Sequence, residues 1–164
     1  MSLETAAKRG VAVHYGPRGT EGKYGRQGVE DGRTKSCEWI FDFDDLPVGQ
    51  TQTLGASIPA NASIVSATLE VLTPFTSTST TSDLLIGLEE GDSTAIDVDG
   101  LISATDATEA TIAVDGALIP GTGALVGFTI GAEIGKLIVA PSVDDLTAGK
   151  GRVIVEYIVD KVGK

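Results

Sequence analysis

Apolar and polar residues alternate over Cys37-Glu-Trp-Ile-Phe-Asp-Phe-Asp44, and this alternation is the clearest structural signal in the sequence. Cysteine, tryptophan and two phenylalanines occupy every second position, and three of the four positions between them are acidic. A period of two is typical of a β-strand with one buried face. The pattern stops at Asp45-Leu-Pro-Val-Gly49, where proline cannot donate to a ladder and glycine relaxes the backbone. This stretch therefore predicts a strand that ends in a turn.

The residues after this turn predict more short strands with turns between them. We expect strands over 50–57, 64–75, 84–89, 111–114, 125–130, 136–141 and 152–160. We expect loops or turns over 58–63, 76–82, 91–100, 121–123, 131–135 and 147–151, and one short helix is an option within 101–113. In the last of these strands, four residues are expected to share one face: Val153, Val155, Tyr157 and Val159. Short strands at spacings of about 8–12 residues indicate an all-β, antiparallel, jelly-roll-like β-sandwich.

The charges of the chain divide it into two parts. No lysine or arginine occurs from Ser36 to Gly135, whereas these hundred residues carry fifteen Asp and Glu. Residues 1–36 hold seven basic and four acidic side chains, a net charge of +3, and residues 37–164 hold five basic and nineteen acidic ones, a net charge of −14. We therefore expect an extended, basic, glycine-rich arm over 1–36 and an acidic β-sandwich body over 37–164.

The arm carries a regular glycine repeat, because glycine occupies every third position from Gly16 to Gly28. A collagen triple helix requires this spacing, since only glycine fits at its axis. Five triplets are few, however, and Pro17 is the only imino acid among them. The sequence thus favours an extended arm that becomes ordered against a partner, and the triple helix stays the alternative.

Tyrosine and basic residues alternate with these glycines. Tyrosine and arginine are the residue types enriched at the energetic centres of protein interfaces. We predict that the contacts with a partner protein are made by seven residues: Tyr15, Arg18, Lys23, Tyr24, Arg26, Arg33 and Trp39.

The sequence offers little that is typical of an enzyme. The only histidine, His14, lies in the arm, so no base is placed beside a nucleophile in the body. The acidic pairs Glu89-Glu90 and Asp144-Asp145 precede turns, where solvated charges are expected. A sugar-cleaving site would also need stacking aromatics, which are scarce after Phe43. We expect no enzymatic activity and no cofactor.

The nearest approach to a metal motif is Asp97-Val-Asp99-Gly100 followed by Asp106. It matches part of a calcium-loop template, but Ala95 stands where the first ligand belongs and no flanking helices are expected. Asp42 and Asp44 are expected to face solvent from one side of a strand. The interpretation we prefer for both groups is a set of solvated carboxylates, with no metal.

Charge and hydropathy also limit the partners and the compartment. An acidic body repels nucleic-acid phosphates and anionic membrane surfaces. No apolar run approaches the roughly 18 residues of a membrane span, and no signal peptide is visible. Cys37 is the only cysteine, so an internal disulfide is impossible. We expect a soluble protein that is made in a cytoplasm and binds neither nucleic acid nor membrane.

Three segments together resemble a known class of proteins. They are a charged leader with Tyr-Gly and glycine-rich steps, an aromatic strand that ends in Asp45-Leu-Pro47, and the run Ile58-Pro-Ala-Asn-Ala-Ser-Ile-Val-Ser-Ala-Thr-Leu-Glu-Val71. The chain is similar to head-associated proteins of tailed, T7-like bacteriophages, which decorate the capsid as knobs or fibres. The resemblance extends from Tyr15 to Tyr157 and is best over Phe41–Val71.

This resemblance implies a non-enzymatic virion structural protein that is synthesised in the host bacterial cytoplasm and decorates the outer surface of the capsid. Its arm would anchor to the major capsid protein, and its acidic body would face solvent. Self-association as a homotrimer or another homo-oligomer stays open. The alternatives are a tail or fibre component, or a carbohydrate-binding β-sandwich module.

Overall fold

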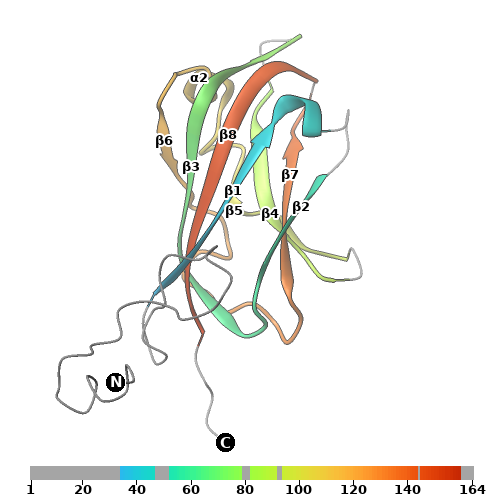
Figure 1. The fold of residues 1–164 in the computed structure, drawn as a ribbon, viewed down its shortest axis with the longest axis vertical. Helices are drawn as coiled ribbons and strands as arrows, with labels where there is room; N and C mark the ends of the chain where they lie inside the picture. The colour runs from blue at the N-terminus through green and yellow to red at the C-terminus, as the bar shows by residue number, and fades with distance from the viewer. Residues whose placement is uncertain (1–33, 47–51, 79–81, 92–93, 144, 160–164) are drawn as a thin grey trace, which may run out of the picture. The chain divides into compact units, whose positions relative to one another are not determined.

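A computed structural model of the chain describes residues 34–46, 52–78, 82–91, 94–143 and 145–159. These residues form two antiparallel four-stranded sheets (Figure 1). The first sheet has the order β1-β8-β3-β6 and is made of β1 (Lys35–Asp42), β8 (Leu146–Val159), β3 (Ala62–Ser77) and β6 (Leu118–Pro120). The second has the order β2-β7-β4-β5 and is made of β2 (Gln52–Ile58), β7 (Gly135–Pro141), β4 (Leu84–Glu89) and β5 (Ala95–Ile102). The prediction of an antiparallel β-sandwich is confirmed.

The aromatic strand forms as its alternation predicts. In β1, Trp39 and Phe41 are buried, Cys37 is half-buried, and Glu38 and Ile40 are exposed. Phe43 departs from the prediction because it begins a 3-10 turn, η1 (Phe43–Asp45), where the backbone N–H of Asp42 donates to Oδ2 of Asp45 at 3.0 Å. A carboxylate that accepts from the backbone in this way favours a turn over a continued strand.

Two glycines of β8 make room for the largest rings of the core. Phe41 and Phe75 stack with their ring centroids 5.8 Å apart and an interplanar angle of 23°. A Cβ on Gly151 would stand 2.7 Å from Cζ of Phe41, and one on Gly149 would stand 2.0 Å from Cδ1 of Phe75. Gly149 also has a φ of 134°, which side-chain-bearing residues rarely adopt. The turn predicted over 147–151 is therefore wrong: these residues are strand, and the glycines serve packing.

The second half of the chain holds the other departures from the prediction. The turn region predicted over 91–100 contains most of β5, and the strand predicted over 111–114 is instead the end of α2 (Glu109–Ile112) and the residues after it. α2 starts where the backbone N–H of Glu109 donates to Oδ1 of Asp83 at 2.9 Å, so a tertiary contact fixes the single helical turn. The strand predicted over 125–130 is a series of turns with one isolated bridge, Ser63 to Thr129.

Candidate functional site

Only one of the seven predicted contact residues lies in the described part of the chain. The other six, Tyr15, Arg18, Lys23, Tyr24, Arg26 and Arg33, fall outside the described residues. So does the glycine repeat. What the structure can place is Trp39 and the surfaces of the body around it.

Trp39 lies on β1 with its ring in the core between the sheets. The residue is 7% exposed, so its side chain presents little surface to a partner. Its indole Nε1 is buried and meets no hydrogen-bond partner among the described residues. Cys37, two residues earlier, donates from Sγ to the backbone oxygen of Val155 at 3.7 Å, and burial raises the pKa of this thiol to about 12. Both side chains therefore belong to the interior of the body.

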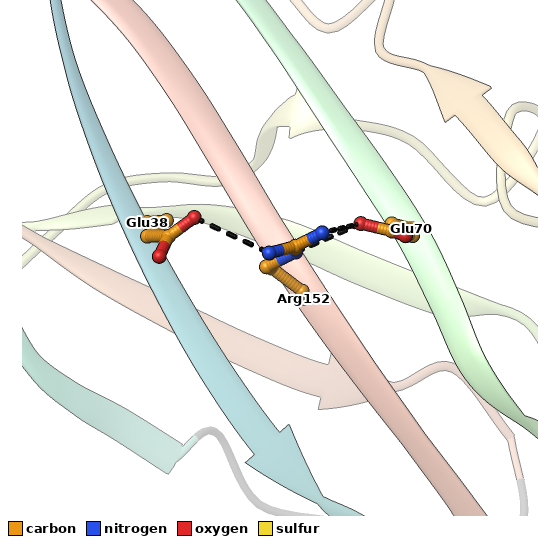
Figure 2. Close-up of polar contacts among 3 residues, drawn as sticks. All are labelled: Glu38, Glu70 and Arg152. Carbon is orange, nitrogen blue, oxygen red and sulfur yellow. Dashed lines mark hydrogen bonds and ion pairs between the residues drawn. The ribbon is translucent and has the colours of Figure 1, made fainter.

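The outer face of the first sheet carries a charged cluster that sequence analysis missed. Figure 2 shows Arg152 of β8 between Glu70 of β3 and Glu38 of β1. Nε of Arg152 donates to Oε2 of Glu70 at 2.8 Å, Nη2 donates to the same oxygen, and Nη1 lies 3.6 Å from Oε2 of Glu38. Hydrogen bonding to Glu70 raises the pKa of Arg152 above its usual value. One guanidinium thus links three neighbouring strands.

The other described basic side chains of β7 and β8 are also engaged within the body. Nζ of Lys150 lies 3.9 Å from Oδ2 of Asp42, and Nζ of Lys136 donates to the backbone oxygen of Gly91 at 3.0 Å. These contacts hold strands and turns together.

The carboxylates that resembled a calcium loop are divided between a strand and the turn that follows it. Asp97 and Asp99 lie on β5, where burial and a hydrogen bond with Asp99 raise the pKa of Asp97. Asp106 instead accepts from the backbone and hydroxyl groups of both Ser103 and Thr122, at 2.7–3.0 Å. Burial raises the pKa of Asp106, but these hydrogen bonds outweigh it, and the pKa is lowered. In the part of the chain that the structure describes, no three His, Cys, Asp or Glu side chains gather as metal ligands would.

The described helices do not include one with the length and apolar character needed to cross a membrane. No protein-family model matches the sequence, and no curated protein matches it.

Solved structures from phage capsids share the fold. A chain of the cyanophage Pam1 capsid asymmetric unit superposes with a TM-score of 0.55 at 17% identity, covering 86% of this chain and 96% of that one. A chain of the capsid of Ralstonia phage GP4 gives 0.53 at 19% identity, over 81% and 88% of the two chains. A chain of the acidic stable capsid of Helicobacter pylori bacteriophage KHP30 gives 0.50 at 18% identity, over 77% and 88%. The β-sandwich is therefore a fold that occurs in phage capsids.

Proposed function

We propose that this chain is a non-enzymatic structural protein of a tailed-bacteriophage virion that decorates the capsid. In this proposal the arm, residues 1–36, anchors to the major capsid protein, and the body, residues 37–164, faces solvent on the outer surface. The observation that carries the proposal is the likeness of the fold to three chains of phage capsids, over 77–86% of this chain. The T7-like, head-associated character indicated by the sequence is part of the same proposal.

The order of the strands supports a jelly roll. Eight strands divide into β1-β8-β3-β6 and β2-β7-β4-β5, and only β4 and β5 are both sequential and hydrogen-bonded neighbours. Jelly rolls are eight-stranded double sheets of this kind and are common in viral capsid domains. A fold of this class hosts many functions, so the partner has to be inferred from the charges and surfaces of the chain.

The distribution of cations supports attachment through the arm. Lys136, Lys150 and Arg152 each contact an oxygen of the body and are committed to its own structure. The arm holds six of the twelve basic residues within its first 33 positions, interleaved with Tyr15 and Tyr24. Trp39 enters the proposal indirectly, since its ring fixes in the core the strand that follows the arm.

Co-sedimentation with capsids assembled from the major capsid protein of the same genome tests this function. Full-length protein should pellet with capsids, and the variant Tyr15→Ala, Arg18→Ala, Tyr24→Ala, Arg26→Ala should bind about tenfold more weakly or worse, as expected when interface anchors are removed. The control Lys161→Ala, Lys164→Ala removes the same number of cations elsewhere and should bind as the unchanged chain does.

Equal binding by the arm variant and the control would refute anchoring through the arm. Binding to purified tails, with none to capsids, would favour the tail or fibre alternative. Binding of the body to glycans, with none to either particle, would favour the carbohydrate-binding alternative.

A further inference from the structure

Three exposed apolar side chains lie at one end of the body. Phe128 is 66% exposed, Ile134 is 49% exposed and Val65 is 43% exposed. We call these three residues the basal patch. The two other phenylalanines that the structure places fully in the core, Phe41 and Phe75, are 1% exposed each. Isolated exposed apolar residues are ordinary, but aromatic residues grouped with aliphatic ones at a surface mark interaction sites.

The backbone around Phe128 is held firmly, although its side chain points into solvent. Gly127 adopts a φ of 88°, and its N–H donates to the oxygen of Ile64 at 2.9 Å. The N–H of Ile64 donates in return to the oxygen of Phe128 at 2.9 Å, and the hydroxyls of Ser63 and Thr129 lie 2.7 Å apart. A backbone segment fixed in this way loses little conformational entropy when a partner covers it.

Backbone contacts bring the three residues to the same end. The N–H of Asn61 donates to the oxygen of Gly131 at 2.9 Å, and Gly135, next to Ile134, pairs with Ile58. The turn between β2 and β3 therefore lies beside the residues that carry Phe128 and Ile134. Val65 follows Ile64 at a register shift of β3.

The first and last described residues of the body lie at this end too. Lys35 pairs with Tyr157, Tyr157 pairs with Ile64, and Val159 pairs with Ala62. In Figure 1, β1 and β3 begin and β8 ends toward the lower end of the view. The chain outside the described body is thus joined to it here, with 33 residues before Thr34.

The nearby edge of the first sheet is poorly suited to adding a strand. β6 is three residues long, and Pro120 has no N–H to donate. The chain then leaves the ladder before returning to β3 at Gly127. Contact along the β6 edge would therefore be made by side chains instead of by a continued sheet.

We propose that the basal patch docks into an apolar hollow on the outer surface of the coat protein, as a second contact beside the arm. This inference rests on the proposed function. An arm bound to the coat raises the effective concentration of whatever part of the body lies close to its attachment point. The opposite end of the body is about 50 Å away along the 16 residues of β3, so a contact there gains much less. Glu133, exposed beside Ile134, suits a hollow bordered by a basic group.

The test compares two full-length double variants in the capsid co-sedimentation assay. Phe128→Ser, Ile134→Ser should bind capsids about tenfold more weakly or worse, the scale expected when an aromatic anchor is removed. The control Val114→Ser, Val143→Ser changes two side chains that are 54% and 66% exposed away from the basal patch and should bind as the unchanged chain does. Hydroxyl-radical footprinting of the unchanged chain adds a readout that needs no variant, in which capsids should protect Phe128 and leave Val143 reactive.

The outcomes separate this inference from the proposed function. Capsid binding by the unchanged chain with no loss in the Phe128→Ser, Ile134→Ser variant and no protection of Phe128 overturns the basal contact alone. No capsid binding by the unchanged chain overturns both proposals. If sedimentation velocity shows that the same variant loses self-association while its capsid binding is intact, the patch joins copies of this chain, and docking onto the coat is wrong.

Discussion

Replacing Gly151 by alanine should destabilise the body through one identifiable contact. The new Cβ would lie 2.7 Å from Cζ and 2.9 Å from Cε1 of Phe41, and 3.1 Å from Cδ1 of Leu69. Phe41 cannot withdraw easily, because it is 1% exposed and stacked on Phe75. Overpacking of this kind costs about 1–3 kcal/mol of unfolding free energy.

A second substitution identifies the cause. Phe41→Leu removes the ring atoms that the Cβ would meet and by itself should cost roughly 1–2 kcal/mol, through lost burial and a small cavity. In the double variant the two changes relieve each other, so its loss of stability should be smaller than the sum of the single losses by about 1–2 kcal/mol.

Urea denaturation followed by the fluorescence of Trp39 measures all four corners of this cycle, because Trp39 is the only tryptophan and is buried. The slope m should stay constant, so that midpoints report stability directly. Gly131→Ala is the matched control, since a Cβ there meets nothing within 4 Å, and it should change stability by less than about 0.5 kcal/mol. Additivity of the two changes to within about 0.5 kcal/mol would show that the Phe41 ring does not lie over Gly151.

Four further predictions concern charged and titratable groups. Burial raises the pKa of Cys37 from 9.0 to about 12, so the thiolate fraction at pH 8 is about 1000-fold lower in the folded protein. An aromatic disulfide reagent should therefore react about 1000-fold more slowly with the folded protein than with the urea-unfolded protein. A difference in rate below tenfold would contradict the burial of Cys37. The same raised pKa means that the free energy of unfolding is retained below pH 9 and falls as the pH rises from 9 toward 12. In Cys37→Ala, the urea midpoint should fall less over this pH range. Arg152→Met removes the link among three strands, so the amide hydrogens of β1 should exchange faster in this variant than in Lys150→Met, which loses only a 3.9 Å contact. Equal exchange rates in the two variants would show that the Arg152 guanidinium does not hold β1. The hydrogen bonds that lower the pKa of Asp106 contribute stability that is present above its ordinary pKa of 3.8 and is lost as the pH falls through the lower folded value. Asp106→Asn should therefore cost more stability at pH 7 than at pH 2, and an equal loss at both pH values would contradict the lowered pKa.

The parts of the fold that the sequence predicts well are those with a strict period of two. β1 places Trp39 and Phe41 in the core as its alternation predicts, and the closing strand places Val153 and Val155 there as expected. In such segments the alternation itself states which face is buried, so no knowledge of the partner strand is needed. The β-sandwich follows from several such segments together.

Elements that exist because of a distant partner were missed. β6 is too short to show a pattern and forms by pairing with residues 68–70 of β3. The apolar run 125–130 suggests a strand, but the left-handed backbone of Gly127 breaks it into turns. In the same way the Arg152 cluster requires the register of three strands, and Glu70 is 82 residues away in sequence. Composition revealed the division of charge, whereas the contact residues of the arm stay a prediction.

The place of β8 between β1 and β3 has a consequence for synthesis of the protein. Cys37 contacts Val155 across 118 residues, and β1 has no other hydrogen-bonded neighbour strand in the described body. At about 5–20 residues per second, a ribosome needs several seconds to deliver β8 after β1 has emerged. During that interval the aromatic face of Trp39 and Phe41 has no sheet to complete it, so the nascent body is most vulnerable to aggregation just before its last strand arrives. Nonsense truncations that remove β8 should therefore yield insoluble chains, even though five of the other seven strands do not pair with β8.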